Sequence, residues 1–256
     1  MKISISLLNY NGRPFLQRCI ESLERHMDEY PNFEVIIVDN NSTKDNSKSY
    51  LRNIKTKLNG QVIYNDENKG FSIANNQASK LATGDIFLLL NNDMITTKGW
   101  LKSIVEVFKT EKNVGIVGSR LIHPGKGTIQ HAGVVEIKDR RLNHIYFGKP
   151  ENYPPANIQK EYFAMTGACL ATPLKLYKEL GGLDEHYWLG WEDIDYNNKV
   201  REKGYKIIYA PKSKLYHYES RSDNRYIAET HNFNLYFHTW VHSGRLNKME
   251  GVKNVK

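Results

Sequence analysis

The sequence predicts an α/β fold built around a mostly parallel central sheet flanked by helices. Short apolar runs alternate with helix-length segments from the N-terminus to about residue 117. The clearest run, residues 86–90, has five consecutive apolar side chains without alternation, as expected for a strand buried on both faces. Strands separated by helices are joined by crossover connections, which indicates parallel pairing.

The first half contains a regular series of elements. Pro14 suits the first turn of a helix, and the apolar side chains that follow it lie near helical spacing. The other elements are short apolar runs and the polar-faced segments between them. We expect strands at 3–8, 33–38, 61–64, 86–90 and 114–117, and helices at 14–26, 45–57, 71–81 and 99–109.

The second half is less regular and predicts a smaller mixed β region. Residues 120–155 mix Gly, Pro, His and basic side chains with short β-like runs. Glycines at 181, 182 and 204 end two helices, because Gly readily adopts the left-handed conformation found there. We expect strands at 133–137, 162–172 (with a turn at Gly167), 206–209 and 214–218, and helices at 173–180, 191–203 and 223–241.

The length is that of one domain. A chain of 256 residues can form a single α/β domain with a sizeable core, and no linker rich in Pro, Gly or Ser divides it. We therefore expect one domain over residues 1–245, with halves 1–118 and 119–245, and a polar tail over 246–256.

Cysteine usage and hydropathy favour a cytoplasmic protein. Cys19 and Cys169 lie among apolar neighbours, which predicts two buried thiols and no disulfide. No apolar run is long enough to span a bilayer. Residues 1–8 lack the long apolar region and the cleavage site of a signal peptide, so we interpret them as the first strand.

The net charge of +8 favours an anionic partner such as a phosphate, a nucleotide or an acidic membrane face. A nucleic acid is not expected, because the sequence shows no helix-turn-helix, zinc-ligand spacing or RNA-binding aromatic motif. Two interpretations of Lys138, Arg140, Arg141 and the basic C-terminal helix and tail remain open. They are peripheral contact with the inner membrane face and a solvated basic surface.

Polar clusters follow the predicted strands at their carboxyl ends, where open α/β sheets bind ligands. Residues 9–13 follow the first strand and residues 39–42 the second. Asp39 could contact a ribose hydroxyl or a base N–H, although residues 40–42 also suit a turn and a helix cap. Asp93 suits a hard divalent cation that binds phosphate oxygens, and an Asn-rich turn is the alternative.

Two further clusters lie at predicted helix N-termini. Lys69 and Gly70 precede a helix, which is an anion site by geometry, and a plain helix cap is the alternative. Glu192, Asp193 and Asp195 fall in the first turn of another helix, where the helix dipole stabilises acids. Because aromatic residues and glycines precede this turn, we also consider a general base there.

The polar clusters form an ordered series that covers residues 2 to about 222. Its pieces are residues 4–11, 37–42, 68–76, 90–93, 166–170, 181–185, 191–195, 209–211 and 214–217. In this order they resemble the inverting family 2 glycosyltransferases of the GT-A fold. Residues 130–133 (Gln-His-Ala-Gly) and 166–169 (Thr-Gly-Ala-Cys) resemble bacterial enzymes of surface-polysaccharide assembly, including those labelled rhamnosyltransferases.

The resemblance implies a nucleotide-sugar-binding first half and a second half that binds the acceptor and carries the catalytic base. Around the nucleotide sugar it implies Leu8, Asn9, Asn11, Asp39, Asn41, Asn68, Lys69, Gly70, Asn76 and Asn92, with Arg221 as a further helper at the diphosphate. For the acceptor it implies Gly167, Ala168, Trp191 and Glu192, with Asp193 as the base and Asp195 as the runner-up.

The resemblance also implies a Mn²⁺ or Mg²⁺ ion held by Asp93 and His217. Asn91 stands where the family has the first acid of its Asp-x-Asp motif, so one carboxylate is missing. Without the family context, His217 would be interpreted as a histidine packed between Tyr216 and Tyr218 at a strand end.

The implied reaction moves a sugar from a UDP-, dTDP- or GDP-linked donor to a hydroxyl of a glycan or lipid-linked acceptor, with inversion. Two alternatives remain open. A nucleotidyltransferase acting on sugar phosphates would be expected to have a Gly- and Lys/Arg-rich first loop, which residues 9–13 match poorly. A non-catalytic module binding sugar nucleotides or glycans is favoured by the missing carboxylate at Asn91.

Overall fold

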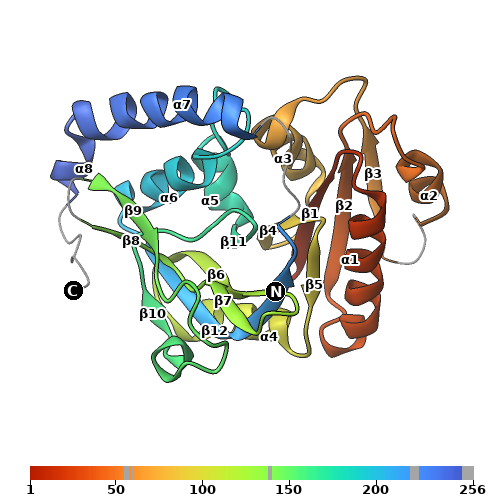
Figure 1. Ribbon diagram of the computed structural model, residues 1–256, viewed down its shortest axis with the longest axis horizontal. Helices are drawn as coiled ribbons and strands as arrows, with labels where there is room; N and C mark the ends of the chain where they lie inside the picture. The colour runs from red at the N-terminus through yellow and green to blue at the C-terminus, as the bar shows by residue number, and fades with distance from the viewer. Residues whose placement is uncertain (55–57, 59, 138–139, 220–224, 250–256) are drawn as a thin grey trace.

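The computed structural model describes residues 1–54, 58, 60–137, 140–219 and 225–249 (Figure 1). Within these residues, ten strands form one sheet in the order β10-β12-β6-β11-β4-β1-β2-β3, with β5 beside β12 and β7 beside β6. A separate two-stranded sheet joins β8 and β9. The predicted α/β class, with a small β region in the second half, is confirmed.

The elements follow the predicted series closely in the first half. The strands are β1 (Ile3–Asn9), β2 (Phe33–Asp39), β3 (Gln61–Tyr64), β4 (Ile86–Asn91), β5 (Met94–Thr96), β6 (Val114–His123), β7 (Thr128–His131), β8 (Val134–Glu136), β9 (Leu142–His144), β10 (Lys160–Glu161), β11 (Cys169–Pro173) and β12 (Lys206–His217). The α-helices are α1 (Arg13–His26), α2 (Ser47–Ile54), α3 (Gly70–Leu81), α4 (Trp100–Thr110), α5 (Leu174–Glu179), α6 (Glu192–Glu202), α7 (Arg225–Tyr236) and α8 (Arg245–Lys248). Short 3₁₀ turns occupy Met27–Glu29 and Pro154–Asn157, and a π-helical segment, Phe237–His242, continues α7.

The strands β3, β2, β1 and β4 run parallel, as the crossover pattern predicts. Helices cover both faces of this part of the sheet. In β4, Leu88 packs in the core that includes α1 and α4, whereas Phe87 and Leu89 pack in the core that includes α3, α5 and α6. Both faces of β4 are therefore buried, which explains why residues 86–90 show no polar alternation.

The carboxyl ends of β1, β2 and β4 lie side by side at one edge of the sheet. Asn9 pairs with Asp39, and Leu8 pairs with Asn91. Strand β11 enters antiparallel between β4 and β6, and the short β5 pairs with the end of β12. The pairing of β5 with β12 places Met94 opposite His217. A strand of the first half and a strand of the second half therefore lie side by side at this edge.

The expected strand at 162–172 is wrong in its first part, because β11 covers only Cys169–Pro173. The side chain of Asn197 donates to the carbonyl oxygen of Met165 (2.9 Å) and accepts from its N–H (2.9 Å). These bonds satisfy backbone groups that a neighbouring strand would otherwise pair. The chain can therefore turn at residues 165–168 without losing hydrogen bonds.

Two other strands differ from expectation. The predicted strands 206–209 and 214–218 form the single strand β12, whose register with β6 shifts between Ala210 and Lys214. Pro211, which has no N–H to donate, lies at this irregularity. Strand β6 continues to His123, because its second part pairs with both β12 and β7.

The C-terminal helices pack on α6. Tyr236, Trp240 and Leu246 are buried in one apolar cluster with Tyr187 and Ile194, and α7 runs along α6 in Figure 1. Residues 246–248 of the expected polar tail thus belong to helix α8, while 250–256 lie outside the described residues.

Cys19 and Cys169 are free and buried, as predicted. Burial raises the pKa of the Cys169 thiol to about 12 and also raises the pKa of Cys19. Both thiols therefore stay protonated and poorly reactive at neutral pH. Among the described residues, no helix has the length and apolar character needed to cross a membrane.

Candidate active site

Asn9, Asp39 and Ser42 form a buried hydrogen-bonded cluster at the ends of β1 and β2. The Asp39 Oδ1 atom accepts from Asn9 Nδ2 (2.9 Å) and Ser42 Oγ (2.6 Å), and Oδ2 accepts from the Ser42 N–H (3.0 Å). Asp39 is fully enclosed by protein groups in this conformation. Its contact with a nucleoside therefore stays a prediction, whereas its role in fixing these two strand ends is visible.

Asn11 fastens the loop after β1 to the loop after β2. Its backbone has φ +50°, and its Oδ1 accepts from the N–H groups of Thr43 and Lys44 (2.9 Å each). Asn41 also has a left-handed backbone (φ +64°), and its Oδ1 accepts from Lys48 Nζ (2.9 Å). Asparagine is one of the few residues other than glycine that often adopt the left-handed conformation, which suits it to both turns.

Asn92 connects the end of β4 to this cluster, since its Nδ2 donates to Asn9 Oδ1 (2.9 Å). Gly12 lies directly against it, and a Cβ atom at Gly12 would be 2.5 Å from Asn92 Nδ2. The glycine in the first loop is thus required by close packing.

The N-terminus of α3 contacts the loop that precedes α6. Gly70 has φ +78°, and a Cβ atom there would lie 2.6 Å from the ring of Trp188. The Phe71 N–H donates to the Trp188 carbonyl oxygen (2.9 Å). Asn68 Oδ1 accepts from Asn40 Nδ2 (3.1 Å) and from the Gly70 N–H (3.1 Å). The residues predicted at 68–70 thus lie beside the loop that leads into α6.

Lys69 forms ion pairs with Asp66 (3.5 Å) and Glu67 (3.6 Å). Both acids are mostly exposed, and such surface pairs contribute little energy. The Lys69 ammonium can therefore exchange these partners for a phosphate at small cost.

Asn76 was predicted to line the nucleoside side of the site, but its side chain contacts Tyr177 and the loop at residues 183–185. Its Nδ2 donates to the Leu183 carbonyl oxygen (2.9 Å) and to Glu185 Oε1 (3.0 Å). Its Oδ1 accepts from Tyr177 Oη (2.7 Å) and from the Leu183 N–H (3.1 Å). All of its amide groups thus hold the 183–185 loop, so the geometry favours a supporting role over direct nucleotide contact.

The pairing of β5 with β12 brings Asp93 and His217 together. Asp93 Oδ1 lies 3.2 Å from His217 Nε2, and both side chains are largely buried. The Tyr218 N–H donates to the Asp93 carbonyl oxygen (3.1 Å), which extends the pairing by one residue. Two residues far apart in the sequence are therefore fixed in contact by backbone bonds.

A carboxylate oxygen and an imidazole nitrogen are both ligands of Mn²⁺ and related divalent ions. Within the described part of the chain, no group of three His, Cys, Asp or Glu side chains could hold a metal ion. Asp93 and His217 supply one ligand of each kind, so an ion held there would need further ligands such as substrate phosphate oxygens and water. The Asn91 N–H bonds to the Ala168 carbonyl oxygen (3.0 Å), which fixes the backbone of this residue within the sheet.

Asp193 lies in the first turn of α6 and faces the loop at Gly167. Its Oδ2 accepts from the Gly167 N–H (2.8 Å), and its Oδ1 accepts from the Ile194 N–H (2.8 Å). A Cβ atom at Gly167 would be 3.1 Å from the Asp193 Cβ, so only a glycine approaches this closely without displacing it. The Asp193 side chain is partly exposed, and its carboxylate keeps acceptor positions for a substrate proton.

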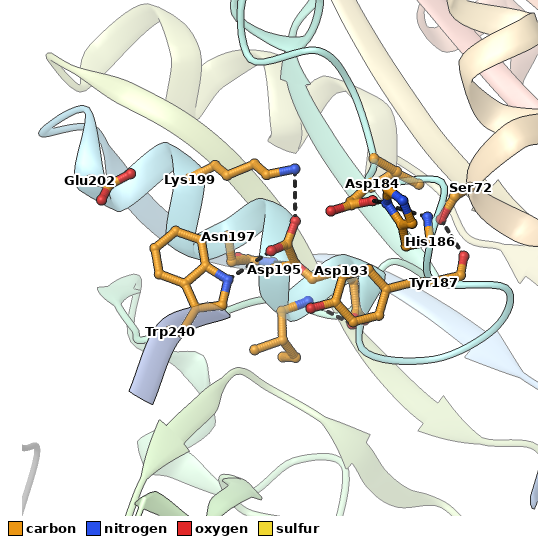
Figure 2. A network of polar contacts seen from close by, with 12 residues as sticks. Ser72, Asp184, His186, Tyr187, Asp193, Asp195, Asn197, Lys199, Glu202 and Trp240 are labelled. Carbon is orange, nitrogen blue, oxygen red and sulfur yellow. Dashed lines mark hydrogen bonds and ion pairs between the residues drawn. The ribbon is translucent and has the colours of Figure 1, made fainter. Parts of the chain in front are cut away.

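Asp195 has a different environment on the same helix (Figure 2). It is fully buried, its Oδ2 lies 2.8 Å from Lys199 Nζ, and its Oδ1 accepts from Trp240 Nε1 (2.7 Å). The Asp195 carboxylate is thus enclosed by protein groups, whereas the Asp193 carboxylate is partly exposed. This geometry favours Asp193 over Asp195 as the candidate base.

The remaining predicted residues line the same region. Trp191 has a left-handed backbone (φ +73°), and its ring packs on Phe233 and Tyr236, with centroids 5.2 and 4.9 Å away. Glu192, in the first turn of α6, and Ala168, just ahead of β11, are buried, whereas Leu8 of β1 is partly buried. Arg221 lies outside the described residues.

Several residues of the site were not predicted from the sequence. Asn65 follows β3, and its Nδ2 donates to Asn40 Oδ1 (2.7 Å), so the strand-end rule could have found it. Asn197 Nδ2 donates to the Asp193 carbonyl oxygen (2.6 Å), which its spacing of four residues in a helix suggests. Asn232, by contrast, reaches the 189–190 loop only through the tertiary fold.

Comparison with known families matches residues 4–167, more than half of the chain, to Glycosyl transferase family 2. The O-antigen biosynthesis protein RfbC of Myxococcus xanthus is 29% identical over 227 residues, a match covering 86% of this chain and 18% of that protein. The chain thus spans less than a fifth of that relative's length. The N-acetylglucosaminyl-diphospho-decaprenol L-rhamnosyltransferase of Mycobacterium tuberculosis is 21% identical over 267 residues, covering 94% of this chain and 85% of that protein.

Among solved structures, GalNAc-T7 with UDP, GalNAc and Mn²⁺ superposes with a TM-score of 0.76. The match has 17% sequence identity and covers 95% of this chain and 50% of that chain. At this identity the likeness concerns the fold alone, and that fold is GT-A. With the match of residues 4–167, it follows that the chain belongs to glycosyl transferase family 2.

Proposed function

We propose that this chain transfers a sugar from a nucleoside-diphosphate donor to a hydroxyl group of a glycan or lipid-linked acceptor, with inversion at the anomeric carbon. The observation that carries the proposal is the placement of two functional groups on one edge of a GT-A sheet. Asp93 and His217 lie in contact there, and Asp193 is held by the Gly167 loop.

The donor is proposed to bind along the ends of β1, β2 and β4, with its diphosphate toward Asp93 and Lys69. The parallel strand ends and the N-terminus of α3 support this orientation, because both favour anionic ligands. A Mn²⁺ or Mg²⁺ ion held by Asp93 and His217 would neutralise the charge of the leaving diphosphate.

Asp193 is proposed to act as the general base. The acceptor oxygen forms a bond to the anomeric carbon while the bond from that carbon to the diphosphate oxygen breaks. The bonding electron pair leaves with the diphosphate, and the acceptor proton passes to a carboxylate oxygen of Asp193. Attack on the face opposite the leaving group inverts the configuration. The backbone N–H groups of Gly167 and Ile194 keep the carboxylate in place during this step.

We propose that the product belongs to cell-surface polysaccharide assembly. The relatives named for O-antigen biosynthesis and for rhamnosyl transfer to a lipid-linked diphosphate support this class of acceptor. UDP-, dTDP- and GDP-linked sugars are the donors to test.

A thermal-shift panel of these nucleotide sugars tests the proposal. With Mn²⁺ present, one nucleotide class should raise the melting temperature, because a ligand at a hundred times its Kd stabilises the folded state by about 2.7 kcal/mol. The shift should disappear in EDTA and in Asp93→Ala. A panel in which no nucleotide sugar shifts the melting temperature contradicts the proposal.

Peripheral contact with an acidic membrane face is a separate proposal, and it rests on the net charge of +8. Arg140 is poorly placed to bind lipid head groups, because its guanidinium already pairs with Glu136 (2.7 Å) and donates to Asn247. Arg141 is exposed, and Lys138 lies outside the described residues. Co-sedimentation with phosphatidylglycerol vesicles and with phosphatidylcholine vesicles tests it, and equal binding to both would exclude the contact.

A further inference from the structure

The segment Gln130-His131-Ala132-Gly133 has no role in the proposed chemistry, yet its first residue lies against the proposed metal ligand His217. Gln130 is the penultimate residue of β7, and its side chain is buried. Its Oε1 lies 2.6 Å from His217 Nδ1. This is a short contact, and it joins β7 to the end of β12.

The orientation of the Gln130 amide follows from its other neighbours. Its Nε2 donates to Glu219 Oε2 (3.3 Å) and lies 3.5 Å from His123 Nδ1. A carboxylate is acceptor only, so the nitrogen of the amide must face Glu219 and the oxygen must face His217. A glutamine oxygen cannot donate, and His217 Nδ1 therefore carries the proton of this hydrogen bond.

A proton on Nδ1 leaves Nε2 as the ring nitrogen available to a metal ion. In a neutral imidazole with a proton on Nδ1, the Nε2 atom presents a lone pair. The Nε2 atom lies 3.2 Å from Asp93 Oδ1, so a ring nitrogen and a carboxylate oxygen converge on one point. Such an arrangement suits a cation.

We infer that Gln130 is a positioning residue that holds His217 with its Nε2 lone pair directed toward a divalent cation shared with Asp93. The inference rests on the proposed function, because it assigns Gln130 to the same metal pair. Groups that accept the second N–H of a metal-bound histidine fix its tautomer and ring orientation, and losing them weakens metal binding about 10- to 100-fold in known sites.

Mn²⁺ binding to the full chain tests the inference without any sugar donor. Free Mn²⁺ is counted by electron paramagnetic resonance, with and without inorganic pyrophosphate as a stand-in for the donor diphosphate. Gln130→Leu keeps the approximate size of the side chain and removes its oxygen, so Mn²⁺ affinity should fall about 10- to 100-fold. The histidine nitrogen modulation in pulsed spectra of bound Mn²⁺ should weaken as well.

A double variant keeps the hydrogen bonds of residue 130 with His217 and residue 219, but exchanges the carboxylate and the amide between positions 130 and 219. In Gln130→Glu with Glu219→Gln, a carboxylate at 130 accepts from His217 Nδ1 and from the new amide at 219. Mn²⁺ affinity should return to within about threefold of wild type, whereas a role in packing alone predicts no such rescue. Gln159→Leu makes the same chemical change at an exposed residue bonded to Glu111, and should leave affinity unchanged. Melting curves in EDTA show whether each variant is folded.

Two further variants, Asp93→Ala and His217→Ala, distinguish a failure of this inference from a failure of the proposed metal pair. If both weaken Mn²⁺ binding and Gln130→Leu does not, the metal pair stands and the role of Gln130 is wrong. If neither weakens it, or wild type binds no Mn²⁺ in either condition, the metal pair itself is wrong and the inference fails with it. If Gln130→Leu is unfolded, an unrescued double variant that is folded contradicts the inference.

Discussion

At the scale of single residues, Asp193 and Asp195 show how surroundings decide what a carboxylate can do. Both lie in the first turn of α6, where the helix dipole favours acids. Asp193 is partly exposed and bonded to two backbone N–H groups, whereas Asp195 is buried against Lys199 and Trp240. Of the two carboxylates, only Asp193 is accessible from outside the protein, which is why we propose it as the base.

We predict that Asp193→Asn lowers turnover about a hundredfold or more, the scale of lost general-base catalysis, while donor affinity stays nearly unchanged. The substitution also costs about 1 kcal/mol of stability, because both carboxylate oxygens accept N–H groups and an amide supplies one oxygen. Steady-state kinetics and donor titration measure the two effects. Normal turnover by Asp193→Asn would refute the assignment.

The sequence predicted which residue types gather at the strand ends, because that follows from the carboxyl ends of parallel strands sharing one edge. It did not predict which of them are already satisfied by protein groups. Asn76 was expected at the nucleotide, but its partners Leu183 and Glu185 come from a loop that is distant in sequence. Only the tertiary fold reveals such partners.

At the scale of elements, the C-terminal helical segment holds the turn that carries Asp193 (Figure 2). Trp240 Nε1 donates to Asp195, two residues after the proposed base. Asn232 Nδ2, on α7, donates to the carbonyl oxygens of Leu189 (2.8 Å) and Gly190 (2.9 Å), just ahead of α6. The segment therefore supports the start of α6 from two sides.

We predict that Trp240→Phe destabilises the fold by about 2 kcal/mol, the usual scale for a hydrogen bond to a charged group. The ring volume is largely kept, and the buried Asp195 carboxylate loses its indole donor. Turnover should fall while donor affinity is maintained, because the first turn of α6 loses a support. Chemical denaturation and kinetics provide the measurements.

Trp100→Phe is the matched control for this substitution. Trp100 is buried in α4, within the core on the other face of the sheet. The Trp100→Phe variant should be less stable because packing contacts are lost, and its turnover per folded molecule should equal that of wild type. Equal losses of turnover in the two variants would contradict a specific role for the C-terminal segment.

Glu34 ties β2 to β1 and to the chain ahead of β4. Burial alone would raise its pKa, but hydrogen bonds from Ser4 (2.6 Å), Lys2 (2.9 Å) and Thr83 (2.8 Å) outweigh burial. The net effect lowers the pKa of Glu34 from 4.5 to about 2. A depressed carboxyl pKa stabilises the fold fully above the unfolded value and loses that effect as pH falls toward the folded value.

We therefore predict that Glu34→Gln lowers the melting temperature at pH 7 and that the gap to wild type narrows between about pH 4.5 and pH 2. Melting curves at intervals from pH 7 to pH 2.5 follow it. A gap that stays constant over this range would show that the carboxylate charge contributes nothing.

The regular elements of the first half could be predicted because their signals are local, namely apolar runs bounded by turn residues. The later strands depend on distant partners. The chain turns at residues 165–168, where Asn197 satisfies the backbone of Met165. Strand β12 continues past Pro211 because β6 pairs with it on both sides of the irregularity. Neither effect has a signature within its own segment.

At the scale of the whole molecule, the two halves share one sheet. Strand β11 of the second half lies between β4 and β6, and β5 of the first half pairs with β12. This interleaving brings Asp93 and His217 into contact and sets the Gly167 loop at the same edge. The sheet itself thus joins the proposed metal pair and the loop that contacts the proposed base.

The most direct test is the release of nucleoside diphosphate from the nucleotide sugar selected by thermal shift. It is measured with Mn²⁺ for wild type, Asp93→Ala and Asp193→Asn, and for wild type in EDTA. We predict turnover by wild type with Mn²⁺, loss of most turnover in EDTA and in Asp93→Ala, and about a hundredfold loss or more in Asp193→Asn with donor binding retained. Full turnover in EDTA, full turnover by Asp193→Asn, or donor binding by wild type without any release would contradict a metal-assisted transferase that uses Asp193 as its base.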